Sequence, residues 1–301
     1  MIKLFSELYY EPIRKVTNSV EDWQDFLSTA GQNYKYSFND QLMIYNQKPQ
    51  ATACAEMSVW NKLGRRVKAG SKGIRLYVQN GDTLYKKYVF DISDTYSKNG
   101  KNLKLWEMNE AENTDIAKNI NKHFNIGNSG DLSSVLMNLS AHFTNEFRVG
   151  IEDSIKLEKG INLEKLINSV KNSSAFMTMK RCGFSNVESY FVKGSFDEII
   201  KINTLESLQN IGDFVSTIST LCITEVKTQA RNLRQEVQNE RLLGDRENIS
   251  TRNIPEGGKR KSPEKSSTVR EIFKDEARLS EGEQSTIDER IADCVYISFS
   301  S

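Results

Sequence analysis

The spacing of apolar residues changes at Gly64, and this change constrains the fold more than any other feature of the sequence. Before Gly64, apolar residues recur every three or four positions, as they do in helices that bury one face. After it, they alternate with polar residues or form short runs, which is typical of strands. The beginning of the chain is therefore predicted to be a small α+β domain, in which helices precede a short antiparallel sheet.

Three helices are predicted before the change. The first covers residues 20–30, where four apolar side chains fall on one helical face and Gly31 follows as a stop. The second begins at Ser37, whose hydroxyl can accept a hydrogen bond from a free backbone amide, and Pro49 ends it. The third is a short helix over residues 58–63.

Three strands are predicted after the change, over residues 66–68, 74–79 and 84–92. The segment 80–82 has the sequence Asn-Gly-Asp, which favours a tight turn, so the last two strands are expected to pair as a hairpin. This sheet completes a first domain that spans residues 1–95.

Two further regions follow the sheet. A mainly α-helical domain is predicted over residues 105–243, because two apolar faces recur there with helical spacing. Residues 244–301 mix charges of both signs with few aromatic residues, so they are expected to form a disordered linker or tail. The two apolar faces comprise Leu163, Leu166, Ile167 and Val170, and Ile211, Val215, Ile218, Cys222 and Val226.

Positive charge is concentrated at the start of the predicted sheet, although the whole chain has a net charge of only +1. Residues 62–75 include six Lys and Arg side chains and no carboxylate. Unpaired charges are not buried, so this run is expected to lie on the surface and to suit a polyanion. The six cations are Lys62, Arg65, Arg66, Lys68, Lys72 and Arg75.

Aromatic and amide side chains are interleaved with the basic run, and flat rings can stack on the unpaired bases of a single strand. The stacking candidates are Tyr36, Trp60, Tyr77 and Tyr88, and the candidates for contacts with phosphates or base edges are Asn39, Gln41 and Gln47. The alternative for the large rings is packing in the core, and the alternative for the amides is capping of helix ends.

The sequence offers little for catalysis. It contains no phosphate-binding G-x-x-x-x-G-K-[ST] loop and no H-E-x-x-H motif, and its two histidines, His123 and His142, are nineteen positions apart. We therefore expect no catalytic residue, no metal and no cofactor.

Cysteine spacing and hydropathy indicate the compartment. The four cysteines are widely separated and form no C-x-x-C pair, so neither a disulfide framework nor a zinc site is predicted. The first fifteen residues lack the pattern of a secretory signal, and no apolar run approaches the roughly 18 residues of a membrane span. A cytoplasmic protein without membrane contact is predicted.

An ordered set of motifs covers the first ninety residues. It comprises the Tyr-Ser-Phe-Asn helix start at 36–39, Gln41, the Gln-x-Pro-x-Ala-Thr stop at 47–52, Trp60, and the Gly-x-x-Val-x-x-Gly-x-x-Gly-Ile run at 64–74. This set resembles the N-terminal domain of ArdC-type antirestriction proteins. It is more similar still to the leading segment of the large helicase and DNA-methyltransferase proteins of Gram-positive conjugative elements. The resemblance implies binding of single-stranded DNA and protection of incoming DNA during conjugative transfer.

The enzymatic parts of these relatives have no counterpart in the sequence. The zinc motif of the metalloprotease-like half of ArdC is missing, and so are helicase and methyltransferase motifs. The predicted function is therefore non-enzymatic binding of single-stranded DNA in mobile-element transfer or antirestriction. Two alternatives stay open. The chain could be a protein-interaction adaptor whose helices bind a helicase/methyltransferase or another conjugation protein, or a truncated leading module of such a protein.

Overall fold

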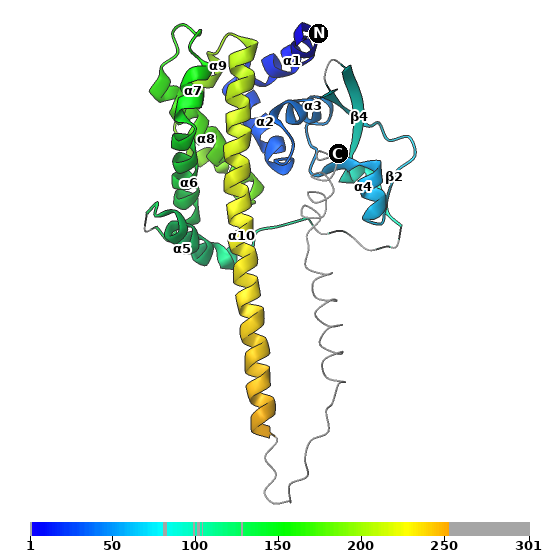
Figure 1. Cartoon of the computed structure of the whole chain (residues 1–301), viewed down its shortest axis with the longest axis vertical. Helices are drawn as coiled ribbons and strands as arrows, with labels where there is room; N and C mark the ends of the chain where they lie inside the picture. The colour runs from blue at the N-terminus through cyan, green and yellow to red at the C-terminus, as the bar shows by residue number, and fades with distance from the viewer. Residues whose placement is uncertain are drawn as a thin grey trace, which may run out of the picture. The chain divides into compact units, whose positions relative to one another are not determined.

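The computed structural model describes residues 2–80, 83–98, 100, 103, 105–127 and 129–252. The chain divides into two compact units. One comprises Met1–Asn102 and Glu107–Ala230, and the other comprises Leu103–Trp106 and Arg231–Ser301. The first unit has an α+β fold that includes both the predicted sheet and most of the predicted helical region (Figure 1).

Four helices open the chain: α1 (Ile2–Val16), α2 (Val20–Gln32), α3 (Phe38–Gln47) and α4 (Met57–Lys62). The hydroxyl of Ser19 caps α2 by accepting a hydrogen bond from the backbone N–H of Asp22 at 3.0 Å. Ser37 caps α3 in the same way, with the N–H of Asp40 at 3.2 Å. The three predicted helices are confirmed as α2, α3 and α4.

The first helix, α1, is missing from the sequence prediction. Pro12 lies inside it and removes one backbone donor, which normally disfavours a helix interior. Tyr9, Ile13 and Val16 are nevertheless buried along one face of α1. Burial of that face offsets the local cost of the proline, because most helical stability in proteins comes from tertiary packing.

The strands form two small antiparallel sheets. In the larger sheet, β4 (Thr83–Asp91) lies between β1 (Cys54–Glu56) and β3 (Ile74–Asn80). In the smaller sheet, β2 (Arg65–Val67) pairs with β5 (Thr95–Ser97). The pairing of β3 with β4 confirms the predicted hairpin, whereas two residues of its predicted turn, Gly81 and Asp82, lie outside the described residues.

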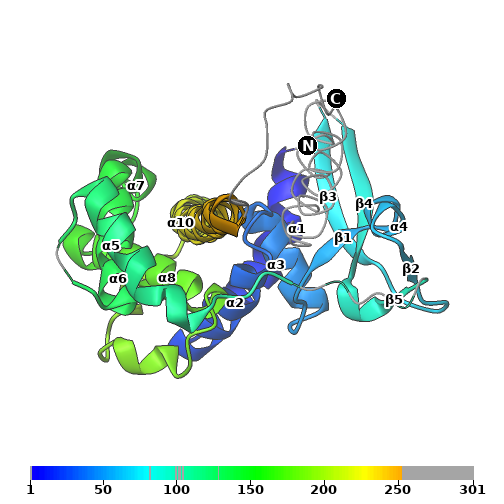
Figure 2. The ribbon, with the colours of Figure 1, turned by 90° about the horizontal axis from the view of Figure 1, so that it is seen from below.

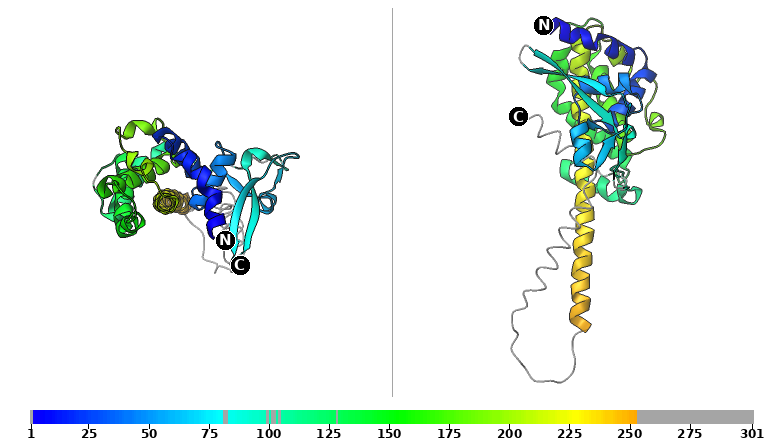
Figure 3. Two further views of the ribbon diagram at one scale, coloured as in Figure 1. Left: turned by 90° about the horizontal axis from the view of Figure 1, so that it is seen from above. Right: turned by 90° about the vertical axis from the view of Figure 1, so that its right-hand side faces the viewer.

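One face of the larger sheet packs against α1 and α3 (Figure 2). Tyr9 from α1 and Ile44 from α3 join Ile74, Leu76 and Val89 from the hairpin in one core cluster. Because side chains alternate along a strand, the residues between these positions point to the opposite face. Figure 3 shows the same sheet from two further directions.

The helical region comprises α5 (Asn113–Phe124), α6 (Leu132–Glu146), α7 (Arg148–Ser154), α8 (Leu163–Arg181), α9 (Asp197–Ile200) and α10 (Leu205–Arg252). Both predicted apolar faces contribute buried residues, including Leu166 and Val170 on α8 and Ile218 on α10. Since α10 ends at Arg252, the tail predicted to begin at residue 244 is helical over its first nine positions. Its remainder lies outside the described residues.

Helices α2 and α3 lie between the sheet and the helices α8 and α10 (Figures 1 and 2). The indole N–H of Trp23 on α2 donates to the hydroxyl of Ser173 on α8 at 2.9 Å. A methyl group at Gly212 of α10 would overlap the ring of Phe38 on α3, so the backbones approach closely there. Residues before and after position 100 therefore share one core.

In the part of the chain that the structure describes, no helix has both the length and the apolar composition needed to cross a bilayer.

Candidate nucleic-acid interface

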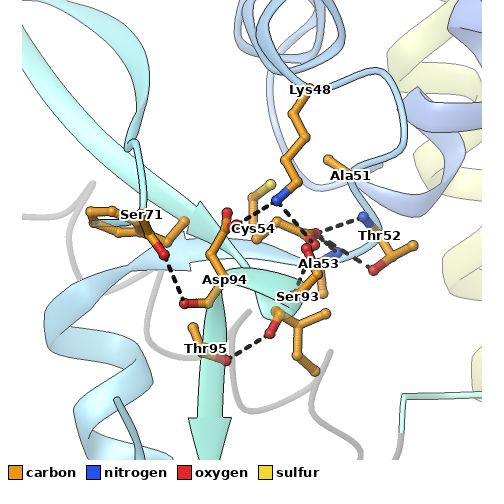
Figure 4. Close-up of polar contacts among 12 residues, drawn as sticks. Lys48, Ala51, Thr52, Ala53, Cys54, Ser71, Ser93, Asp94 and Thr95 are labelled. Carbon is orange, nitrogen blue, oxygen red and sulfur yellow. Dashed lines mark hydrogen bonds and ion pairs between the residues drawn. The ribbon is translucent and has the colours of Figure 1, made fainter. Parts of the chain in front are cut away.

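The two sheets are joined into one bent, two-stranded ribbon, which we define as residues 65–80 and 83–97. Residues 68–73 connect β2 to β3, and the short helix η1 (Ile92–Asp94) connects β4 to β5. These two connections bind each other. The carbonyl of Asp94 accepts a hydrogen bond from the N–H of Lys68 at 2.8 Å. It also accepts one from the hydroxyl of Ser71 at 3.3 Å (Figure 4).

A buried carboxylate fixes this joint. Asp91, at the end of β4, accepts hydrogen bonds from the backbone N–H groups of Thr52 at 2.7 Å, Ala53 at 2.9 Å and Ser93 at 3.0 Å. The ammonium of Lys48 lies 2.7 Å from the carboxylate of Asp94 and 4.0 Å from that of Asp91 (Figure 4). Both described acids of the ribbon are therefore engaged by Lys48 and by backbone amides, away from the basic run.

Five of the six predicted cations are exposed. Among the described residues, no carboxylate lies within 4.0 Å of any of the five. Their hydrogen-bond partners are neutral: Arg66 donates to the side-chain carbonyl of Asn61 at 2.6 Å, and Lys68 donates to the carbonyl of Ser93 at 2.8 Å. The positive charge is thus uncompensated. The five are Lys62, Arg66, Lys68, Lys72 and Arg75.

Arg65 differs from the other five and corrects the sequence prediction. Its side chain is buried, its Nε donates to the hydroxyl of Thr95 at 2.6 Å, and its Nη2 donates to the carbonyl of the same residue at 3.1 Å. Burial lowers the pKa of the guanidinium from its ordinary value. Arg65 therefore ties β2 to β5 and is not part of the exposed basic run.

Arg75 and Tyr88 meet on the face of the hairpin that points away from the core cluster, and Tyr77, which also packs against the cluster, lies beside them. Arg75 on β3 lies directly opposite Tyr88 on β4, and Tyr77 is two positions along β3 on the same face. The guanidinium of Arg75 donates hydrogen bonds to the hydroxyl oxygens of Tyr77 and Tyr88, and these bonds raise its pKa. Tyr88 is 48% exposed, whereas Tyr77 is half-buried. The hairpin thus presents a cation beside an open ring.

Two predicted stacking residues are in the core, which corrects their assignment. Trp60 is fully buried, and its indole N–H donates to the carbonyl of Phe90 at 2.8 Å. Tyr36 is buried in the core cluster, and its hydroxyl donates to the carbonyl of Cys54 at 2.9 Å. Both rings fill the space between helices and sheet, so neither can meet a base in this structure.

The three predicted amide contacts are already used inside the protein. Gln41 is buried and donates to the carbonyl of Tyr36 at 2.9 Å. Asn39 accepts a hydrogen bond from Gln209 at 3.3 Å. Gln47 exchanges two hydrogen bonds of 2.9 Å with the backbone N–H and C=O of Arg75, so it covers the free edge of β3. Capping of a helix end, the alternative left open by the sequence, fits Gln41, whereas Asn39 and Gln47 bind another side chain and a strand edge.

Exposed residues that the sequence prediction missed lie along the same ribbon or directly after its last residue. Tyr85 and Tyr96 are 54% and 51% exposed, and Lys86 and Lys98 are exposed beside them. Lys86 and Tyr85 fall inside a predicted strand, so their exposure could have been expected from its tyrosine and lysine content. The exposure of Tyr96 could not be expected from the sequence, because its strand β5 is only three residues long and forms by pairing with β2.

Among the described residues, no group of three or more His, Cys, Asp and Glu side chains could hold a metal ion. His123 lies 3.0 Å from Glu225, and His142 lies 3.4 Å from Glu146, all of them in the helical region. The thiol of Cys54 is buried, and this burial raises its pKa well above the ordinary value, which keeps it protonated.

Comparison of the chain with family models, with curated proteins and with solved structures found no match. The resemblance to ArdC-type domains therefore stays a prediction that rests on the motifs of residues 36–74.

Proposed function

We propose that this protein binds single-stranded DNA without enzymatic activity, and that the ribbon is its interface. The observation that supports this most directly is the set of five exposed cations that have no carboxylate partner among the described residues. Repulsion among these like charges destabilises the folded protein. A polyanionic strand would compensate it.

The exposed tyrosines support a single strand over a duplex. The ring of Tyr88 lies beside the guanidinium of Arg75. One nucleotide could therefore stack its base on the ring while its phosphate contacts the guanidinium. In a duplex the faces of the bases are already stacked on one another. Each base–ring contact contributes about 1–3 kcal/mol, which a duplex would forfeit.

The cations predict a strong dependence on salt. If each of the five neutralises one phosphate, the slope of log K against log salt concentration is about −3.5 for a single strand. Raising the salt concentration from about 50 to about 200 mM should then weaken binding roughly 100-fold. Fluorescence anisotropy with a labelled oligothymidylate and with a matched duplex would measure both the slope and the preference.

A charge-reversal pair tests the location. Replacing Arg66→Glu together with Arg75→Glu should weaken binding at least tenfold and reduce the slope by about 1.4, because two phosphate contacts are lost. The matched control is Lys159→Glu with Lys193→Glu, which reverses two exposed lysines of the helical region. Equal losses from the two double variants would count against the ribbon, and a wild type that prefers duplex would count against the function.

The setting suggested by the resemblance is mobile-element transfer or antirestriction. It can be tested separately, by measuring how well a conjugative plasmid becomes established in a restricting host in the presence of wild type or of the Arg66→Glu, Arg75→Glu variant. Equal establishment with both would remove the antirestriction role without touching DNA binding.

A protein-interaction adaptor is the second candidate. Leu157 and Val192 in the helical region are 87% and 80% exposed, so each offers an apolar side chain that a protein partner could cover. Recovery of one partner that is unaffected by nuclease, and that is lost in a Leu157→Ser, Val192→Ser variant, would favour the adaptor over the DNA-binding protein.

A further inference from the structure

The ribbon contains a second cation and ring that lie directly opposite each other. Arg66 on β2 is the register partner of Tyr96 on β5, so the two side chains share one face of the smaller sheet. Tyr96 is 51% exposed, and Arg66 is exposed as well. The arrangement repeats that of Arg75 and Tyr88 on the larger sheet.

The second pair is held in place by the surrounding structure. The guanidinium of Arg66 donates to Asn61 at 2.6 Å, which orients it. Arg65, the neighbour on the opposite face, binds Thr95 through two hydrogen bonds and fixes β2 against β5. The N–H of Lys98 donates to the carbonyl of Gly64 at 3.1 Å and extends the pairing. A ligand would therefore meet a largely preorganised cation and ring.

The two pairs are connected by exposed positive charge. Lys68 and Lys72 lie in the segment 68–73 that links β2 to β3, and both are exposed. A strand that followed the ribbon from one pair to the other would pass this segment. Its phosphates would then remain close to cations along the way.

We infer that one DNA single strand occupies both pairs at once, with one base on Tyr88 beside Arg75, another on Tyr96 beside Arg66, and the phosphates between them near Lys68 and Lys72. This inference rests on the proposed function and adds a second subsite to it. Its occupant is a strand long enough to span both rings.

The chain itself limits the required length. Tyr88 and Tyr96 are eight positions apart, and at about 3.3 Å per residue the segment between them spans at most about 26 Å. At about 3.4 Å per stacked nucleotide, this distance corresponds to about eight nucleotides, and to fewer in an extended strand. An oligonucleotide of about ten nucleotides is therefore long enough to reach both rings, and we expect one of about three nucleotides to reach only one.

Competition with oligothymidylates of about 3, 6, 10 and 20 nucleotides would test this inference in the full chain. For wild type, we expect affinity to rise steeply between about three and ten nucleotides. Tyr96→Ala should weaken binding of the longest strand about tenfold and change binding of the shortest by no more than about twofold, because the short strand can still use Tyr88. Tyr96→Phe, which keeps the ring, should stay within about twofold of wild type at every length.

The outcomes separate the two proposals. If wild type binds long strands and Tyr96→Ala binds them equally well, the second subsite is overturned and the proposed function stands. If Tyr96→Ala weakens the shortest strand as much as the longest, the two rings belong to one compact site and the spanning strand is overturned. If wild type binds no single strand, both proposals fail. Tyr190→Ala, at an exposed tyrosine of the helical region, serves as the control and should bind like wild type.

Discussion

The helical region and the ribbon treat charge in opposite ways. In the helical region, several cations have a carboxylate partner, whereas five exposed cations, one at the end of α4 and four on the ribbon, have none among the described residues. A net charge of +1 therefore conceals a local excess, which only the positions of the charges reveal. The helical pairs are Arg148 with Glu164, Lys156 with Asp153, Lys180 with Glu188, and Lys201 with Glu198.

Aromatic rings show a parallel contrast. Trp23 and Trp60 are buried, and each indole N–H has a hydrogen-bond acceptor, as large rings in a core usually do. Tyr88 and Tyr96 are about half exposed, each opposite an arginine. The same residue class thus holds the fold together at one place and offers an open surface at another.

The largest expected change in stability distinguishes the buried rings from the exposed ones. Trp60→Ala should lower the free energy of unfolding by about 3–5 kcal/mol, because it leaves a cavity in the core and removes the hydrogen bond to the carbonyl of Phe90. Tyr88→Ala should lower it by less than about 0.5 kcal/mol, since its ring is open to solvent on one side. Urea denaturation followed by circular dichroism measures both. A loss of stability in Tyr88→Ala as large as that in Trp60→Ala would break the comparison.

The second largest expected change in stability concerns the contact between α3 and α10. Gly212→Ala should destabilise the protein by about 1–3 kcal/mol, because the added methyl group overlaps the ring of Phe38. In an open helix the same substitution would stabilise by about 1 kcal/mol, so even the sign is informative. The matched control is Thr217→Ala, at an exposed position of the same helix, which should not destabilise. A stabilised Gly212→Ala variant would mean that α3 and α10 do not pack as described.

Long elements with clear periodicity were predictable from the sequence, and elements that depend on partners were not. Helices α2 and α3 have their own caps, α4 has a glycine stop at Gly64, and the hairpin of β3 and β4 has its own alternation. The strands β1 and β5 have three residues each and form only by pairing with β4 and β2. The helix α1 required tertiary burial to overcome Pro12.

The candidate site was predictable to the level of the segment but not of the individual side chain. Composition alone located the basic run. Whether a residue in it is inside or outside depends on strand register, and adjacent residues have opposite orientations. Arg65 and Arg66 look alike in the sequence, but only Arg66 is exposed. Tyr96 is opposite Arg66 because β5 returns to β2, a long-range pairing that the local pattern does not encode.

The smallest expected change in stability tests the contrast between the paired cations of the helical region and the unpaired cations of the ribbon. Arg148→Ala with Lys156→Ala removes two helical ion pairs and should lower the free energy of unfolding only slightly at low salt, since exposed pairs contribute little each. Arg66→Ala with Lys72→Ala removes two unpaired charges and should leave stability unchanged or raise it slightly, because repulsion within the basic run decreases.

Salt should act on the two double variants in opposite directions. Added salt screens attraction in the helical region, so the gap between wild type and the Arg148→Ala, Lys156→Ala variant should shrink. It also screens repulsion in the ribbon, so wild type should gain more stability from salt than the Arg66→Ala, Lys72→Ala variant does. Urea denaturation at two salt concentrations gives both differences. If the ribbon variant behaved like the helical one, the ribbon cations would have carboxylate partners in solution, and the physical basis for a polyanionic ligand would be lost.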